Sequence, residues 1–458
     1  MSVTRFIVSG FRRFLPSPFV IALLLSALTL LLAAAFGSYP EGASAWKSVL
    51  LSWESGLWNP GLLVFAYQMM LILVLGHVVV LSRPMERLIG RITSLVRDGA
   101  SAALLVTATT VLVALFNWGL GLIFGAILAR KVGEHASRNG IPLNYPLIGA
   151  CGYLGLMVFN GGISGSAAIK ASEPGHITDL LTGIVPPQTM SLLPASIPTA
   201  DTIFAPANLG VSALLLLVLS SMAYYLGKKT APTPIDLPDF AASQPDEKPA
   251  TGAERLDHSP WVAWIFGAVI IAAFLLQYLP RLQRLDLTPN MLNFFMLGLG
   301  VVLHGSISRF GRAVASAIGG TSGILIQFPL YFGIMGVMAD SGLIRIISDF
   351  FVAIGTGTSY PIYTFISAGL VNIFIPSGGG QWAIQGPIIL QAALDLNVPL
   401  AKALMALAYG DQLTNMLQPF WALPLLGITR LKAREILPYS LLFMVAGTVI
   451  FIGGLLFW

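Results

Sequence analysis

The chain has 458 residues, of which 56% are hydrophobic and only 10% are charged. Soluble domains carry about 25% charged residues, so the composition excludes an ordinary soluble protein and predicts an all-α polytopic membrane protein. The formal net charge of +5 comes from short basic clusters between apolar runs, which is the pattern of cytoplasmic loops and not of nucleic-acid binding. A single cysteine, Cys151, excludes an internal disulfide.

Two membrane spans are predicted at the N-terminus. Pro18 to Phe36 is longer than the apolar core of a usual signal peptide, so we interpret it as a retained first helix. A near-neutral loop leads to a second span, Pro60 to Leu81. Positive charge predicts that the N-terminus and the loop after Leu81 are cytoplasmic. The basic residues are Arg5, Arg12 and Arg13 before the first span, and Arg83, Arg87, Arg91 and Arg97 after the second.

Two interrupted apolar segments follow. Residues 102–132 are broken at Asn117-Trp118-Gly119 and have basic residues at both ends, which predicts a re-entrant hairpin on the cytoplasmic side. The alternative is one long tilted span. Residues 145–171 are broken between Asn160 and Ser166, which predicts a discontinuous helix of the kind that lines transporter binding sites.

The order span, hairpin, broken helix, span then recurs. An outside loop (172–207) and a span (208–226) end the first half, and a polar cytoplasmic linker (230–259) separates the halves. The second half is predicted to contain spans at 261–279, 289–303, 319–338 and 437–458, an outer hairpin at 360–396, and a broken helix at 399–427 that is interrupted between Asn415 and Pro419.

This order predicts nine crossings, two hairpins and two repeats, residues 1–229 and 260–458. A shift of 259 places Gln68 on Gln327 and Gly119 on Gly378. Five crossings separate equivalent elements, so the repeats are expected to be inverted in the membrane, as in alternating-access transporters. The C-terminus is then periplasmic.

The second hairpin has the clearest break. Gly378, Gly379 and Gly380 lie between Pro376 and Pro387, and three glycines with two prolines are not expected to continue a helix. N–H groups at the start of the following helix suit a small anion. The alternative is a glycine-rich surface loop.

Asp411 is the one carboxylate inside a predicted broken helix, and it shares a face with Thr414, Asn415 and Gln418. It is expected to take up a proton or to ligate Na⁺ as the coupling ion. The alternative is a structural aspartate that pairs with helix N-termini.

The other candidate residues are neutral hydroxyls, amides and glycines. No Lys or Arg lies at either hairpin tip, so a monocarboxylate is served better than a di- or tricarboxylate. Trp118, Trp382 and Trp421 flank the breaks as possible apolar walls, although core packing explains them equally well. No further cofactor or metal is predicted. The predicted substrate-binding residues are Asn117, Gly119, Ser164, Gly165, Ser166, Ser377, Gly378, Gly379, Gly380, Gln381, Asn415 and Gln418, and the predicted pathway residues are Gln68, Gln327, Gln385 and Gln412, with helix–helix hydrogen bonding as the alternative for Gln68 and Gln327.

Two rival functions remain at this point. Gly162-Ile163-Ser164-Gly165 is a Gly-x-Ser-Gly string, as in intramembrane serine proteases, and His77 or His304 would have to act as the base. A channel is the third class, but the sequence shows no ring of charges and no repeated filter.

Several strings resemble the bacterial short-chain fatty acid transporter family over nearly the whole chain. They are Asn117-Trp118-Gly119-Leu120-Gly121-Leu122, Gly161-Gly162-Ile163-Ser164-Gly165-Ser166, Gln327-Phe328-Pro329, Pro376-Ser377-Gly378-Gly379-Gly380-Gln381-Trp382 with Ile384-Gln385-Gly386-Pro387, and Ala408-Tyr409-Gly410-Asp411-Gln412 with Gln418-Pro419-Phe420-Trp421-Ala422-Leu423-Pro424.

The resemblance implies an inner-membrane carrier for short monocarboxylates such as butyrate or acetoacetate. The chain is also similar to the wider ion-transporter superfamily, which includes divalent anion/Na⁺ symporters with paired hairpins, elevator-like motion and homodimers. Their hairpin tips carry Ser-Asn-Thr motifs, whereas the matching positions here read Asn117-Trp118-Gly119 and Ser377-Gly378-Gly379.

Overall fold

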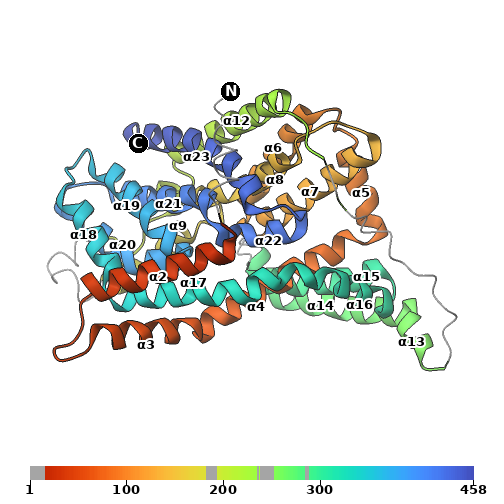
Figure 1. Cartoon of the computed structure of the whole chain (residues 1–458), viewed down its shortest axis with the longest axis horizontal. Helices are drawn as coiled ribbons and strands as arrows, with labels where there is room; N and C mark the ends of the chain where they lie inside the picture. Colours follow the sequence, from red (N-terminus) through yellow and green to blue (C-terminus); the bar gives the residue numbers. More distant parts are fainter. Residues whose placement is uncertain (1–15, 182–192, 235–236, 238–251, 284–287) are drawn as a thin grey trace.

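The computed structural model describes residues 16–181, 193–234, 237, 252–283 and 288–458, and all regular structure in this part is helical (Figure 1). Arg5, Arg12 and Arg13 and most of the predicted linker lie outside the described residues. The first half contains α2 (Pro18–Phe36), α3 (Ala45–Leu57), α4 (Pro60–Val80), α5 (Arg83–Thr93), α6 (Gly99–Phe116), α7 (Trp118–Asn139), α8 (Tyr145–Tyr153), η1 (Leu154–Met157), η2 (Phe159–Gly161), α9 (Ser166–Ala171), α10 (His176–Leu181), η3 (Thr199–Asp201) and α12 (Pro206–Lys229).

The second half begins with two helices that precede its repeated part, a short one and a long one. Its elements are α13 (Glu254–His258), α14 (Pro260–Gln283), α15 (Pro289–His304), α16 (Ile307–Ala317), η4 (Ile318–Thr321), α17 (Ser322–Asp340), α18 (Leu343–Ala353), α19 (Tyr360–Phe374), α20 (Gly378–Asp395), α21 (Leu400–Thr414), η5 (Asn415–Leu417), α22 (Pro419–Thr429) and α23 (Ala433–Leu456).

The helix order of the first half recurs in the second. Adding 259 to the first residues of α5, α6 and α7 gives 342, 358 and 377, and α18, α19 and α20 begin at 343, 360 and 378. α4 and α17 pack together near the centre of the molecule and run toward opposite ends (Figure 1). The two copies are therefore inverted relative to each other, as predicted.

Both predicted hairpins form. A methyl group on Gly121 would lie 2.6 Å from the Cα of Ala114, and one on Gly125 would lie 2.7 Å from Cγ2 of Thr110, so α7 folds back along α6. This antiparallel contact excludes the alternative of one long tilted span. α20 folds back along α19 in the same way, and the two hairpins approach the centre from opposite sides (Figure 1).

Several segments that were predicted as loops are helices, among them α3, α5 and α16. α3 packs against α17, where a methyl group on Gly56 would lie 2.5 Å from the carbonyl oxygen of Phe332. α16 packs Ala313 and Ala317 against α4. Each segment mixes charged and apolar residues, so its average hydropathy is low, and tertiary packing of the apolar side forms the helix.

Eight described segments are long and apolar enough to cross a membrane. Seven of them match predicted crossings, and the eighth is α6, the first arm of the inner hairpin. The remaining two predicted crossings are the short α15 and the broken pair α21–α22.

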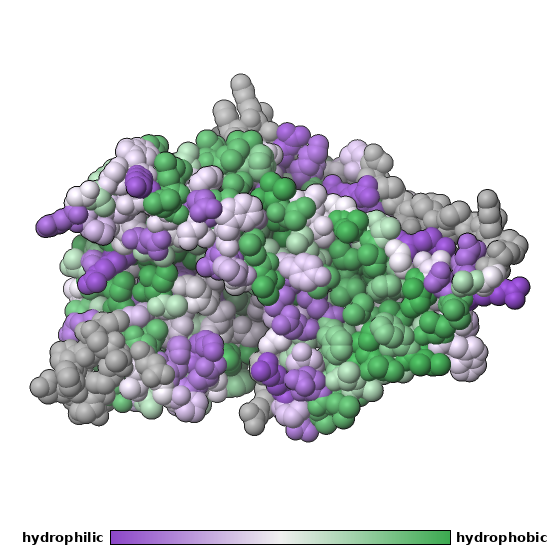
Figure 2. Space-filling model, turned by 90° about the horizontal axis from the view of Figure 1, so that it is seen from below, coloured by the Kyte–Doolittle hydropathy of each residue, from purple (hydrophilic) through white to green (hydrophobic). Residues whose placement is uncertain are grey.

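An uncovered apolar surface identifies faces that contact lipid. α14 packs mainly against α15, and its outer side exposes large side chains, among them Trp261 (68% exposed) and Leu276 (86% exposed). Seen from below, a broad hydrophobic surface covers the part of the molecule that contains α14 and α15 (Figure 2). Soluble proteins rarely expose an apolar patch of this size, whereas the lipid chains of a bilayer cover such a surface favourably.

Candidate functional site

The two broken helices cross at their breaks. The first helix leaves α-helical geometry after Tyr153 and resumes at Ser166, while η5 interrupts the second. Asn160 joins the two: its backbone N–H donates to Oε1 of Gln412 (2.8 Å), and its side-chain amide donates to Oδ2 of Asp411 (2.6 Å). The Oδ1 of Asn160 accepts from the backbone N–H of Ser166 (3.0 Å). One buried asparagine thus holds both breaks together.

The second break is bonded to the first in return. The hydroxyl of Tyr153 donates to the carbonyl oxygens of Asn415 (2.8 Å) and Gln418 (2.9 Å). The side-chain amide of Asn415 donates to the carbonyl oxygen of Leu156 (3.3 Å). Carbonyl groups freed by the breaks therefore have partners inside the protein, which lipid requires.

The tip of the first hairpin contacts the first break. Asn117 is extended (φ −152°) and caps α7, with its Oδ1 accepting from the N–H of Leu120 (2.9 Å). The N–H of Trp118 donates to Oγ of Ser164 (2.9 Å). Gly165 is needed beside it, because a methyl group there would lie 2.4 Å from the carbonyl oxygen of Asn160.

The tip of the second hairpin corrects one prediction. The three glycines form the first turn of α20 instead of interrupting a helix, and Pro387 lies inside α20. The break lies just before them, where Ser377 caps the helix and its Oγ accepts from the N–H of Gly380 (3.2 Å). Glycine and a capping serine are both well suited to a helix start, so the triplet begins a helix without strain.

This second tip touches the carboxylate. A methyl group on Gly378 would lie 2.9 Å from Oδ2 of Asp411 and 3.2 Å from Oγ of Ser166, whereas one on Gly379 would have no neighbour within 4 Å. Asp411 is 2% exposed, while Ser166 and Ser377 are half-buried. In the described part of the chain, no Lys or Arg bonds to these groups. The tip therefore brings together hydroxyls, helix-start N–H groups and one acid.

The side-chain amides of α20 and α21 mostly form hydrogen bonds between helices. Gln381 and Gln385 lie on one face of α20, and Nε2 of Gln381 donates to Oε1 of Gln385 (2.8 Å) and to the carbonyl oxygen of Ala368 (2.9 Å). Nε2 of Gln385 donates to Oγ of Ser367 (2.9 Å). Both side chains thus tie α20 to α19. Gln412 and Asn415 join the crossed breaks, whereas the side chain of Gln418 bonds the carbonyl oxygen of Asn372 on α19.

The two predicted pathway glutamines lie in different surroundings. Nε2 of Gln68 donates to Oδ1 of Asn290 (2.9 Å), which is the helix–helix contact foreseen as its alternative. Gln327 is half-buried on α17, and its Oε1 is enclosed without a hydrogen bond in the described part of the chain. Of these two glutamines, Gln327 is therefore the one whose side chain has a polar atom without a hydrogen bond in the part of the chain that the structure describes.

Aromatic side chains form a wall beside the first tip. The rings of Trp118 and Trp421 meet edge to face at 5.3 Å, and Phe65 lies 6.1 Å from Trp421. Trp382 is not part of this wall, because its Nε1 donates to Nε2 of His176 (3.0 Å). Two of the three predicted tryptophans therefore lie together.

Sequence reasoning missed two asparagines as site residues. Asn160 was noted only as the start of a break, and Asn372 was not singled out. The amide of Asn372 donates to the carbonyl oxygen of Asp411 (2.7 Å) and to Oδ1 of Asn415 (2.9 Å). An amide in an otherwise apolar run, such as Val371-Asn372-Ile373, is the signal that identifies such a residue.

The structure lends no support to a serine hydrolase. Nε2 of His304 bonds the carbonyl oxygen of Val78 (2.8 Å), and His77 lies on α4 at a cavity that Arg430 also lines. In the described part of the chain, no histidine bonds Ser164, whose oxygen accepts from Trp118 instead. The pair of groups that the hydrolase hypothesis requires is not assembled.

Comparison with solved structures finds distant likenesses. The Alcanivorax borkumensis YdaH transporter, described as having an unusual topology, has a TM-score of 0.43 and 15% identity, with 96% of this chain and 98% of that chain covered. Neisseria gonorrhoeae MtrF, described with a class of antimetabolite efflux pumps, has a TM-score of 0.42 and 15% identity, with 97% of this chain and 96% of that chain covered. These values are too low to transfer any detail.

Sequence comparison is decisive. The family model described as "Short chain fatty acid transporter" matches residues 1–458. A "Putative short-chain fatty acid transporter" of Escherichia coli K12 is 34% identical over 464 residues, which cover 99% of this chain and 98% of the relative. One of the same name from Haemophilus influenzae Rd is 35% identical, with 99% of both chains covered. Members of this family are transporters, so the protein is not an enzyme, and the chain belongs to the short-chain fatty acid transporter family.

Proposed function

We propose that this protein is a secondary active carrier of short-chain monocarboxylates, such as butyrate or acetoacetate, which it moves by alternating access together with a proton. The observation that carries the proposal is the meeting of Asp411, Ser166 and Gly378 where the second hairpin tip reaches the crossed breaks. The coupled proton would bind Asp411, and the anion would bind the hydroxyls and helix-start N–H groups of this tip.

A single negative charge suits this site better than two or three. Helix-start N–H groups and hydroxyls stabilise one carboxylate without a cation. The nearest basic side chain on these elements, Lys170, is paired with Glu173 (2.9 Å) at the exposed end of α9. A second carboxylate would have no cation to compensate it, which disfavours di- and tricarboxylates.

The position of Asp411 explains why a proton would accompany the anion. Two unit charges about 4 Å apart repel by about 4 kcal/mol at an effective dielectric constant of 20. An ionised Asp411 beside a bound carboxylate would meet this repulsion, and only the amide of Asn160 donates to its side chain in the described part of the chain. A proton on Asp411 removes the repulsion, so proton and anion favour each other's binding.

Sodium is the second candidate for the coupling ion. A hard cation between Asp411 and the substrate would also relieve the repulsion, and it prefers oxygen ligands. The buried Oδ1 of Asn372 and Oε1 of Gln418 have no hydrogen bond in the described part of the chain. Asn372 bonds the carbonyl oxygen of Asp411, and the amide of Gln418 bonds the carbonyl oxygen of Asn372, so both side chains belong to the surroundings of the second break.

The proposal extends to the motion and the assembly. The hairpins and crossed breaks would move as one body against the layer that contains α3, α4 and α17, in an elevator-like step. By the implied likeness to the ion-transporter superfamily, the carrier would be a homodimer in the inner membrane, with its N-terminus in the cytoplasm and its C-terminus in the periplasm.

Uptake of labelled butyrate into proteoliposomes tests the substrate and the ion together. We expect concentrative uptake under a pH gradient alone, measured against protein-free vesicles, because protonated butyrate crosses lipid unaided. Uptake that requires a Na⁺ gradient would show that sodium, and not the proton, is the coupling ion. Folded protein that gives no uptake above the vesicle baseline in either gradient would refute the proposed function.

Asp411→Asn tests the coupling residue. The amide keeps the shape of the side chain but takes up no proton, so we expect butyrate exchange to persist while concentrative uptake driven by the pH gradient is lost. Counterflow of labelled butyrate measures the first process, and gradient-driven uptake the second. A variant that still concentrates butyrate like the parent protein would remove Asp411 from the coupling mechanism.

A further inference from the structure

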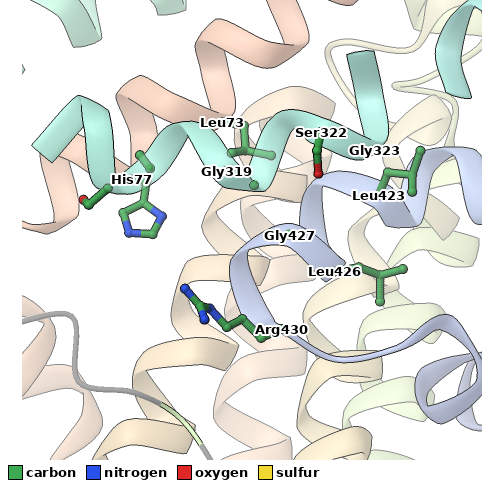
Figure 3. A pocket seen from close by; sticks show the side chains of 12 residues that line it. Leu73, His77, Gly319, Ser322, Gly323, Leu423, Leu426, Gly427 and Arg430 are labelled. Atoms are coloured by element: carbon green, nitrogen blue, oxygen red, sulfur yellow. The ribbon is translucent and has the colours of Figure 1, made fainter. Parts of the chain in front are cut away.

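A cavity of about 410 Å³ lies between α4, the junction of η4 with α17, and the end of α22 (Figure 3). His77 and Leu73 line it from α4, Ser322 from the start of α17, and Gly427 and Arg430 from the other wall. It is separate from the hairpin tips, and we call it the Arg430 cavity.

Arg430 is the charged residue among those that line this cavity, and it is positive. Arg430 and His77 point toward one another across the opening (Figure 3), and none of the lining residues is an Asp or Glu. The guanidinium of Arg430 forms no hydrogen bond or ion pair in the described part of the chain. The wall therefore presents a cation and an imidazole with no compensating acid.

The backbone conformation of Arg430 indicates that its side chain has a functional role. Arg430 closes α22 in the left-handed conformation (φ 58°), a position at which glycine is usual. Asn397 is the other described non-glycine residue with positive φ, and asparagine tolerates that conformation well, whereas arginine does not. Strain of this kind concentrates at functional sites.

Other charged residues lie beside the Arg430 cavity. A small adjoining cavity shares His77 with Arg130 and Lys131. Both cations contact one carboxylate, that of Glu134, at 2.7 and 2.9 Å. Arg430 is thus one of three cationic side chains that line the two cavities on either side of His77.

The lining of the cavity includes residues of α17, and residues of α22 that lie between Arg430 and the candidate site in the sequence. Leu423 lines its inner part, next to Gln327, whose Nε2 would lie 3.5 Å from a methyl group on Gly323. Trp421 of the aromatic wall is two residues before Leu423. From Arg430 to Gln418 the helix covers about 18 Å at 1.5 Å per residue.

A second cavity has the opposite character. It has a volume of about 250 Å³ and lies between α3, α17 and the second hairpin tip. Asp340 lines it together with Ser55 and Gly380, and its lining contains neither Lys nor Arg. The two cavities differ in the sign of the charge that they attract.

We propose that the Arg430 cavity is a second carboxylate-binding site, in which Arg430 holds the anion before it passes Gln327 and the aromatic wall to the hairpin tips. This inference rests on the proposed function for its ligand, a short monocarboxylate. It goes further by assigning a binding residue outside the tips and by making one side of the pathway anion-attracting.

Thiol labelling tests the site without relying on transport. The natural thiol is removed by Cys151→Ala, and Ser322→Cys places a reporter in the Arg430 cavity. Ser55→Cys is the matched reporter in the Asp340 cavity. We expect an anionic methanethiosulfonate to react with the Ser322→Cys protein about tenfold faster than a cationic one of equal size, and the preference to reverse for Ser55→Cys.

Ligand protection and an arginine variant complete the test. Butyrate should slow labelling of Ser322→Cys, and neutral butyramide should not. Adding Arg430→Gln should abolish the charge preference and the protection, while Arg434→Gln, an exposed residue outside the lining, should leave both unchanged. Arg430→Lys should retain them, which separates lost charge from lost fold.

The outcomes separate this site from the proposed function. Charge preference and butyrate protection without any butyrate uptake would support the site and refute the function. Uptake by the parent protein with no charge preference and no protection at Ser322→Cys would refute the site and leave the function. Protection by an anionic lipid, phosphatidylglycerol, and not by butyrate would assign the cavity to headgroup phosphate and overturn the carboxylate proposal.

Discussion

At the scale of single residues, Asn160 connects the two broken helices through its backbone and its side chain. Its side chain bonds the carboxylate of Asp411 and the N–H of Ser166, and its backbone bonds Gln412. A buried carboxylate that loses its donor pays the full desolvation penalty of that group. Asn160 is therefore expected to contribute more to the stability of the crossed breaks than a residue with a single bond.

Asn160→Ala is expected to destabilise the protein by about 3 kcal/mol, because it leaves both Asp411 and the N–H of Ser166 without their partner. Thermal unfolding in detergent measures the effect. The control is Asn139→Ala, since Asn139 is exposed and bonds only within the last turn of α7. Equal melting temperatures for the two variants would show that Asn160 does not hold the breaks.

Gly378 and Gly379 provide a matched pair at the second tip. Gly378→Ala places a methyl group 2.9 Å from the carboxylate of Asp411, while Gly379→Ala places one in open space. We expect the first to reduce butyrate uptake at least about tenfold, since a shift of roughly 1 Å in a binding site has effects of this size. The second should change uptake less than twofold, by about 0.4 kcal/mol or less. Similar uptake by both variants would place the substrate elsewhere.

The residue types of the site could be predicted from the sequence, but their directions could not. Asp411, Ser166 and Gly378 were each identified from breaks in apolar runs, and the structure brings them together. Gln381 was predicted to bind the substrate and Gln385 to line the pathway, yet the amide groups of both bond within the hairpin. Which side of a helix faces a neighbour depends on contacts from distant elements, which local sequence does not encode.

At the scale of elements, glycine allows the helices to approach closely. A methyl group on Gly410 of α21 would lie 2.1 Å from the carbonyl oxygen of Phe365 on α19, and one on Gly125 of α7 would lie 2.2 Å from that of Gly152. Helices in lipid associate through such small-residue contacts, because no hydrophobic effect drives them together. These positions hold the hairpins in place.

Gly410→Ala is expected to lower stability by about 1–3 kcal/mol, because the added methyl group overpacks the contact of α19 with α21. Gly210→Ala on α12 is the control, since nothing lies within 4 Å of its added methyl group. Alanine is the better helix former, so the control should be neutral or slightly stabilised. Thermal unfolding compares the two, and a stable Gly410→Ala protein would contradict the close packing.

The longer the apolar run of a helix, the more reliably the sequence predicted that helix. The long spans, the hairpins and the second break at Asn415 were identified correctly. α3 and α16 were missed because each carries polar residues that lower its average hydropathy. The apolar side of α3 packs against α17, and that of α16 packs against α4. A window average of hydropathy cannot recognise a helix whose partner is distant in the sequence.

At the scale of the whole molecule, one backbone contact links α22 to the layer of α16 and α17. A methyl group on Gly427 would lie 2.5 Å from the carbonyl oxygen of Gly320. Both glycines line the Arg430 cavity. If α22 moves against this layer during transport, the described arrangement requires that residue 427 carries no side chain.

Gly427→Ala is expected to disfavour this arrangement and to open the Arg430 cavity. Labelling of the Ser322→Cys reporter by a neutral methanethiosulfonate should then accelerate, while Gly453→Ala, whose added methyl group meets nothing within 4 Å, should not change it. Unchanged labelling in both variants would mean that α22 and the layer keep their spacing.

The crossing of the two breaks has a consequence for biosynthesis. Asn160 leaves the ribosome about 250 residues before Gln412, its partner. At 5–20 residues per second, that interval lasts roughly 12–50 s, during which the first break is in the membrane without the groups that later satisfy it. Insertion of this carrier therefore includes a waiting period with exposed backbone in lipid, and a chaperone or the translocon itself has a defined segment to shield until the second half arrives.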